Sequence, residues 1–107
     1  MSDPQGTNDA IISDLSDDAD MVELVELFVG ELPQRAASMN DAIQQQDLDA
    51  LCRIAHQLKG AAGGYGFPTI TDAARELEQA VKANEALEKL TEEVKTISSM
   101  CDRARAQ

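Results

Sequence analysis

The sequence predicts an all-α protein, an antiparallel up-down-up-down four-helix bundle that follows a loose or short-helical N-terminal arm. Three observations lead to this prediction. Apolar residues make up 43% of the 107-residue chain, which is enough for one modest core. They recur every three or four residues, as on helices, and do not alternate as on strands. The links between the four periodic segments are short, which makes neighbouring helices antiparallel.

The predicted arm comprises residues 1–18, and the bundle domain comprises residues 19–107. The arm is rich in Asp, Ser, Asn and Gly and offers only Ile11, Ile12 and Leu15 for packing. Such a segment buries little apolar surface, so we expect it to dock one short helical turn at most. We expect no strand anywhere in the chain.

The first long helix begins near Asp20 and carries one apolar stripe. The members of this stripe are Met21, Val25, Phe28, Leu32, Ala36, Met39 and Ile43. Their spacing of three or four residues is that of one long amphipathic helix or of two. Pro33 lacks a backbone donor and has Gly30 nearby, yet the register continues on both sides. We therefore expect a kink and not a break.

Three shorter helices follow. Asp47 is a plausible N-cap for the second helix, which ends in the helix-stopping sequence Gly63-Gly64-Tyr65-Gly66. Pro68 suits the first turn of the third helix, and Asn84 can cap the fourth. Their apolar stripes are Leu48, Leu51, Ala55, Leu58 and Ala62, then Ile70, Ala74, Leu77 and Val81, and finally Leu87, Leu90, Val94, Ile97 and Cys101.

The charge balance excludes several kinds of partner. The chain has 9 Lys and Arg against 20 Asp and Glu, a net charge of −11 with the histidine neutral. Such a balance repels phosphate backbones and anionic membranes, so we expect neither nucleic acid nor a membrane as partner. The chain also lacks an apolar run of about 20 residues and a signal peptide, which predicts a cytoplasmic location. Cys52 and Cys101 fall in apolar registers and are interpreted as reduced core residues.

His56 is the only histidine, and it lies on a flank of the second helix instead of its apolar stripe. It shares that flank with Cys52, Lys59, Gly60 and Gly63, because successive helical residues turn by about 100°. Each glycine costs about 1 kcal/mol relative to alanine, and together they clear space beside the imidazole. A neutral imidazole near an ammonium suits a phosphate anion, with the ring as nucleophile. The alternative interpretation is a solvated polar face.

The residues that follow His56 resemble the signature of histidine-containing phosphotransfer (HPt) domains. In that signature, His-x-Leu-Lys-Gly is followed by small residues and a further glycine. The matching segment here is His56-Gln57-Leu58-Lys59-Gly60-Ala61-Ala62-Gly63-Gly64-Tyr65-Gly66. Leu77-Glu78 on the third helix also looks like the family's usual Leu-Glu. The resemblance spans residues 19–104 and leaves out the acidic arm.

The resemblance implies a phosphorelay intermediate of a two-component signalling system. His56 would accept a phosphoryl group from an aspartyl phosphate on one receiver domain and pass it to an aspartate on another. The receivers would belong to a hybrid sensor kinase or a response regulator, and they would supply the magnesium ion and most catalytic groups. We therefore expect a phosphocarrier with no cofactor of its own and no kinase or ATP-binding activity.

The same resemblance implies roles for the residues around His56. Lys59 would steady the phosphoryl oxygens, and Gly60 and Gly63 would let the receiver approach. Gly66 would permit the sharp exit from the helix. Counting residues from the turns also places Arg35 and Arg75 level with His56. Either arginine could help a phosphoryl group or pair with a partner's acids, although a solvent-facing arginine is the commoner outcome.

Other functional classes fit less well. The glycine cluster lacks the lysine and the preceding strand of a phosphate loop. One histidine and two core cysteines cannot supply zinc ligands, the acids lack calcium-loop spacing, and no base and orienting acid are evident for a serine nucleophile. Dimerisation helices of sensor kinases carry an acid and a Thr-Pro after the histidine, whereas Gln57 follows here.

Two further alternatives keep the same bundle. A helical adaptor would bind a receiver domain without phosphotransfer. The same bundle also forms the first domain of chemotaxis kinases, so an excised fragment remains an alternative to the free-standing protein that we expect. One stripe on each helix is accounted for by one bundle, so we expect a monomer.

Overall fold

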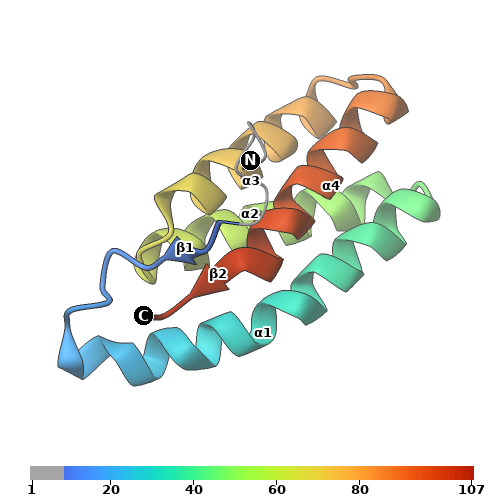
Figure 1. Ribbon diagram of the computed structural model, residues 1–107. Helices are drawn as coiled ribbons and strands as arrows, with labels where there is room; N and C mark the ends of the chain where they lie inside the picture. Colours follow the sequence, from blue (N-terminus) through green and yellow to red (C-terminus); the bar gives the residue numbers. More distant parts are fainter. Residues whose placement is uncertain (1–8) are drawn as a thin grey trace, which may run out of the picture.

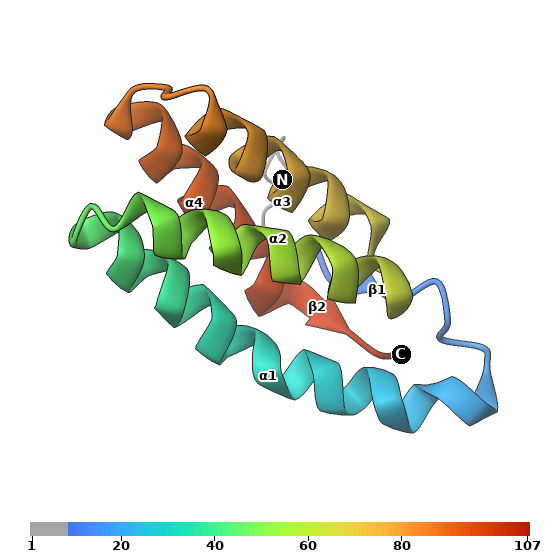
Figure 2. The ribbon, with the colours of Figure 1, turned by 180° about the vertical axis from the view of Figure 1, so that it is seen from behind.

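The computed structural model describes residues 9–107 and confirms an all-α fold built on four helices (Figure 1). The helices are α1 (Ala19–Gln44), α2 (Leu48–Gly64), α3 (Pro68–Lys82) and α4 (Leu87–Arg103). α1 and α3 each pack against both α2 and α4, so the helices form a ring in chain order. Seen from behind, α2 lies between α1 and α3 (Figure 2). In residues 9–107, none of the four helices combines the length and the apolar character that spanning a bilayer requires.

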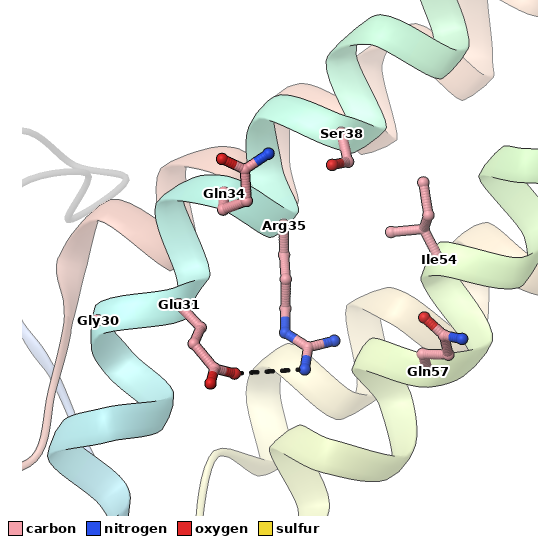
Figure 3. A pocket seen from close by; sticks show the side chains of 7 residues that line it. All are labelled: Gly30, Glu31, Gln34, Arg35, Ser38, Ile54 and Gln57. Carbon is pink, nitrogen blue, oxygen red and sulfur yellow. Dashed lines mark ion pairs between the residues drawn. The ribbon is translucent and has the colours of Figure 1, made fainter.

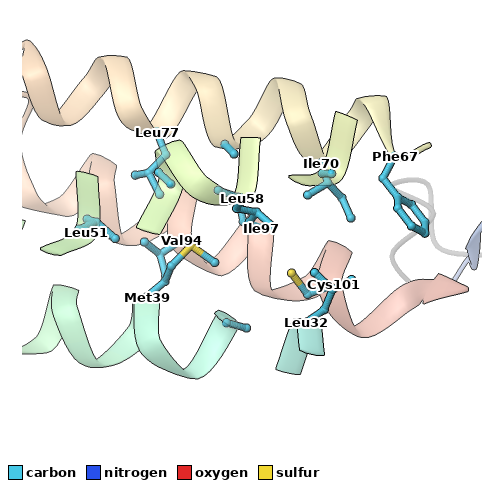
Figure 4. Packing of buried hydrophobic residues seen from close by; sticks show 14 of the residues in the cluster. Leu32, Met39, Leu51, Leu58, Phe67, Ile70, Leu77, Val94, Ile97 and Cys101 are labelled. Carbon is cyan, nitrogen blue, oxygen red and sulfur yellow. The ribbon is translucent and has the colours of Figure 1, made fainter. Parts of the chain in front are cut away.

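The predicted stripes meet inside this ring and form the core (Figure 4). The stripes depart from full burial only at helix starts, where Met21 and Leu48 are partly buried and Leu87 is exposed. Cys101 is buried among the stripes and Cys52 is half-buried, and both are free thiols. Burial of four facing stripes is the main favourable contribution to the stability of such a bundle.

The three links between helices end the preceding helix in the same way. Each contains one residue with a left-handed backbone, namely Gln46 (φ 56°), Gly66 (φ 86°) and Asn84 (φ 57°). The amide after each of these residues donates to an alanine carbonyl of the last helical turn: Asp47 N to Ala42 O (2.9 Å), Phe67 N to Ala62 O (2.9 Å) and Glu85 N to Ala80 O (3.1 Å). This Schellman pattern satisfies carbonyls that a helix end would otherwise leave open.

Two of the predicted helix starts and the continuous first helix are confirmed. The Asp47 side chain accepts a hydrogen bond from Ala50 N at 3.1 Å, as an N-cap should. Pro68 is the first residue of α3, where its missing N–H costs nothing. α1 runs through Pro33 without a break.

The predicted cap of the fourth helix is corrected. Asn84 belongs to the end of α3, where it adopts the left-handed conformation that the Schellman pattern requires. Asparagine tolerates that conformation better than most residues with a side chain. Ala86 precedes α4 instead, and no side-chain hydrogen bond caps that helix.

Residues 9–18 differ from the predicted loose or short-helical arm, while residues 1–8 of that arm lie outside the described residues. A strand β1 (Ile11–Ile12) pairs in parallel with β2 (Ala104–Arg105), directly after α4. The amide of Ser13 extends this ladder by donating to Arg105 O at 3.0 Å. The expectation of no strand is therefore corrected, because the backbone of the arm finds partners at the other end of the chain.

The arm is also hydrogen-bonded to the turn between α2 and α3. The Ser13 hydroxyl donates to Tyr65 O at 2.7 Å, and Asp14 N donates to Gly66 O at 2.8 Å. Only 2% of Ser13 is exposed. The same hydroxyl accepts from Leu15 N at 3.0 Å, which satisfies this buried polar group twice. The arm thus fixes the turn that follows α2.

Replacing Gly66 should show how tightly the arm is held. A Cβ at this position would lie 2.5 Å from Ser13 Oγ and 2.9 Å from Asp14 N, on a backbone with φ +86°. We expect Gly66→Ala to lower the free energy of unfolding by about 1 to 3 kcal/mol. Denaturant titration measures this loss. Gly64→Ala is the control, because nothing lies within 4 Å of a Cβ there. Equal stability of the two variants would contradict the close packing of Ser13 and Asp14 against Gly66.

Candidate functional site

The structure places His56 near the middle of α2, on the side that faces α3. Its neighbours Ala55 and Leu58 are fully buried, which fixes the rotation of the helix. The imidazole side chain remains 65% exposed, although its Nδ1 lies 2.9 Å from Glu78 Oε2 on α3. The ring is therefore held at one nitrogen while most of its surface meets solvent.

Glu78 is the centre of the site. Its side chain is only 6% exposed, and three side chains approach its carboxylate. Besides His56, Lys59 Nζ donates to Oε1 at 2.8 Å and Lys82 Nζ donates to Oε2 at 3.2 Å. A buried carboxylate is stable only with such partners. α2 and α3 together thus build a cluster of one acid, two ammonium groups and one imidazole.

These partners keep Glu78 ionised. The hydrogen bond from Lys59 is the largest cause that lowers the pKa of Glu78, burial raises it, and the hydrogen bonds from Lys82 and His56 lower it further, to about 2. An ionised carboxylate only accepts hydrogen bonds, so Nδ1 of His56 must carry the hydrogen that they share. In the neutral ring, the lone pair then lies on Nε2.

Lys59 lies one turn after His56 and binds the same carboxylate. The Lys59 ammonium is therefore already held beside the ring. Thr71 of α3 fixes the backbone of α2 at this level, because its hydroxyl donates to Lys59 O at 3.1 Å. The backbone carbonyl and the side-chain ammonium of Lys59 are thus both bound to α3. These two contacts position the lysine relative to His56.

The three predicted glycines have different surroundings. Nothing lies within 4 Å of a Cβ at Gly60, one turn after His56, so packing inside the described chain does not require this glycine. A Cβ at Gly63 would lie 3.4 Å from Thr71 Oγ1, which indicates a close approach of α2 and α3 there. Gly66 lies against Ser13 and the residues after it. Open surface beside His56 is thus found at Gly60.

Arg35 lines a cleft of about 460 Å³ between α1 and α2 (Figure 3). The lining residues are Gly30, Glu31, Gln34, Arg35, Ser38, Ile54 and Gln57. The guanidinium of Arg35 pairs with Glu31 at 3.6 Å and lies 5.8 Å from the ring centre of Phe28. These contacts join Arg35 to its own helix and not to His56.

Arg75 lies on α3, and its Nη1 donates to Asp72 Oδ1 at 2.8 Å. Both side chains are exposed, and such a pair contributes little to stability. The structure thus gives Arg75, like Arg35, an acidic partner on the same helix. Within residues 9–107, no group of three or more His, Cys, Asp or Glu side chains is placed to hold a metal ion.

Glu78 and Lys82 are the members of the cluster to which sequence reasoning gave no role. From the sequence, Glu78 is named only in the Leu77-Glu78 pair that looks like the Leu-Glu of HPt domains. A signal was present, because Glu78 follows Ala74 by four residues and precedes Val81 by three, which places a carboxylate in a core register. Lys82, four residues later, is its helical neighbour. A buried acid with a lysine at that spacing indicates a paired charge.

Comparison with known proteins identifies one family. A family model described as the Hpt domain matches residues 23–107. This range contains every residue of the cluster around Glu78 and most of α1. No curated protein and no solved structure matches the chain.

The ionisation of Glu78 predicts how stability depends on pH. Its pKa is about 2 in the folded chain against an ordinary 4.5, so its charge contributes fully above about pH 4.5. This contribution is lost as the pH falls toward 2. Near neutral pH, Glu78→Gln should unfold with about 1 to 3 kcal/mol less free energy than the wild type, and the difference should shrink across that window.

Urea titrations of both proteins between neutral pH and pH about 2 measure this difference. Glu26→Gln, at an exposed position of α1, is the control for removing one negative charge. A stability gap between wild type and Glu78→Gln that does not change with pH would refute the assignment of the ionised carboxylate.

Proposed function

This chain belongs to the Hpt domain family, whose function is histidine phosphotransfer in a phosphorelay, and we propose that His56 is its phosphoryl acceptor. The observation that carries the proposal is the hydrogen bond between His56 Nδ1 and Glu78 Oε2. It leaves the lone pair of the neutral ring on Nε2, in a side chain that is largely exposed. Nε2 is therefore the nucleophile that a receiver domain reaches.

The transfer needs no base at Nε2, because this nitrogen carries a lone pair and no hydrogen. The lone pair of Nε2 attacks the phosphorus atom of an aspartyl phosphate on the receiver, and the Nε2–P bond forms. The P–O bond to the aspartate breaks, and its electron pair stays on the aspartate carboxylate. The imidazole becomes positively charged and keeps its hydrogen on Nδ1, where the carboxylate of Glu78 stabilises it. Reversal of these steps on a second receiver completes the relay.

Lys59 and Gly60 support the same transfer from the side of the helix. Lys59 lies one turn after His56, and its ammonium would neutralise phosphoryl oxygens once it turns from Glu78 toward them. Gly60 leaves the surface beside His56 open, so the backbone of a receiver loop approaches without displacing a side chain. The chain acts as a phosphocarrier, and phosphoryl groups come from its partners.

Treatment with phosphoramidate tests the acceptor directly. We expect the wild type to gain one acid-labile phosphoryl group, with the release of ammonia, while His56→Gln gains none. Intact mass and ³¹P NMR measure the modification. The variant should remain folded, because a side chain at a largely exposed position contributes little to the core. A phosphorylated His56→Gln would refute the assignment, and an unmodified wild type that still binds receivers would support a helical adaptor.

Gly60→Leu tests the open surface. We expect this variant to accept phosphoryl groups from phosphoramidate as the wild type does, because a small donor needs no docking surface. Transfer from a phosphorylated receiver domain that serves the wild type should fall by about tenfold or more. Gly64→Leu, at another helical glycine with open space around its Cβ, is the matched control. Unchanged receiver transfer in Gly60→Leu would contradict the proposed approach.

A further inference from the structure

The ion pair of Lys82 differs from the pairs that Lys89 and Lys95 form between exposed side chains. Its side chain is 65% exposed, yet its ammonium reaches inward to the buried Glu78 carboxylate, four residues earlier on α3. By contrast, Lys95 pairs with Glu92 at 3.4 Å on α4, and both of those side chains are exposed. Surface pairs of that kind contribute little, whereas a partner of a buried charge contributes more.

The proposed function gives Lys59 two roles that compete. In the structure, its ammonium donates to Glu78 Oε1 at 2.8 Å. During transfer, the same ammonium is needed at the phosphoryl oxygens on His56. Withdrawing Lys59 from Glu78 takes one cationic partner from a buried carboxylate, which is unfavourable unless another partner stays.

The two carboxylate oxygens of Glu78 accept hydrogen bonds from different partners, and this difference resolves the competition. Oε1 accepts from Lys59, while Oε2 accepts from both His56 and Lys82. When Lys59 leaves Oε1, both bonds at Oε2 are kept. Lys82 is then the remaining ammonium group that neutralises the carboxylate, and the carboxylate continues to hold the hydrogen of His56 Nδ1.

We propose that Lys82 is a positioning residue of the phosphoacceptor site, which keeps Glu78 paired while Lys59 turns to the phosphoryl group. This inference rests on the proposed function of His56. The hydrogen bond from Lys82 also lowers the pKa of Glu78, in the same direction as that from Lys59 and against the effect of burial. Lys82 touches neither the ring nor the phosphoryl group in this scheme and acts through Glu78.

The experiment compares the rates of phosphorylation by phosphoramidate and of phosphohistidine hydrolysis in a set of variants. We expect Lys82→Met to slow phosphorylation and to shorten the lifetime of phosphohistidine, each by about three- to tenfold. Lys82→Arg, which keeps the positive charge, should restore both. Lys95→Met removes the same charge from an equally exposed lysine and should match the wild type within a factor of about two.

A double-mutant cycle separates positioning from a merely structural role. If Lys82 acts through the carboxylate that Lys59 also binds, then the effect of Lys82→Met on the rate should differ by more than about threefold between the wild-type and Lys59→Met backgrounds. A structural role would instead give the same loss in both backgrounds. All rates are measured at a temperature well below the midpoint of thermal unfolding of each variant. That midpoint is determined in parallel.

Three outcomes would overturn the inference. Wild-type kinetics in Lys82→Met would overturn it alone and leave the proposed function standing. Equal effects of Lys82→Met with and without Lys59 would do the same. A wild type that accepts no phosphoryl group would overturn the proposed function together with the inference.

Discussion

The site depends on one buried carboxylate. Too little of Glu78 is exposed for water alone to satisfy its charge, so cations from α2 and α3 pair with it. The chain as a whole carries a net charge of −11, yet around this acid it gathers two ammonium groups and an imidazole. A local surplus of positive charge on an acidic protein offers anions one preferred place. Everything proposed for His56 follows from that placement.

The close packing of α2 and α3 makes this arrangement possible. Gly63 lets Thr71 come near the backbone of α2, and the Thr71 hydroxyl binds Lys59 O. These contacts fix the height of α3 relative to α2, so that Glu78 lies opposite His56. A helix pair held at backbone level changes less on binding than a pair held by long side chains alone, which suits a group that must be positioned before its partner arrives.

The helices were predictable from the sequence, and the arm and the centre of the site were not. Apolar spacing, the Asp47 cap and Pro68 each act locally, so one stretch of sequence contains all that is needed. Pairing of Ile11 with Ala104 joins residues from opposite ends of the chain, and no local pattern reports it. Counting residues along the helices predicted that Arg35 and Arg75 lie level with His56 along the bundle axis. It did not predict the direction in which each side chain leaves its helix.

Glu78 shows a different limit. A glutamate next to a stripe is ordinarily taken as the edge of a solvated face, and its burial depends on cations that come from two helices at once. The resemblance to HPt domains marked Leu77-Glu78 as a matching pair without assigning it a contact. The core register of Glu78 and the lysine four residues later indicate a paired charge, but the partners from α2 are seen only in the structure, where the carboxylate binds His56 and Lys59 as well as Lys82.

The contacts of the arm also fasten each described end of the chain to a segment from the other end. Arg103 Nη1 donates to Asp9 O at 3.3 Å, and Gln107 Nε2 donates to Ser16 O at 3.4 Å. Because β1 and β2 run in parallel, Asp9 lies at one end of the strand pair and Gln107 at the other. The described chain therefore enters and leaves the bundle at two separate points, and the same short strand pair holds both of them.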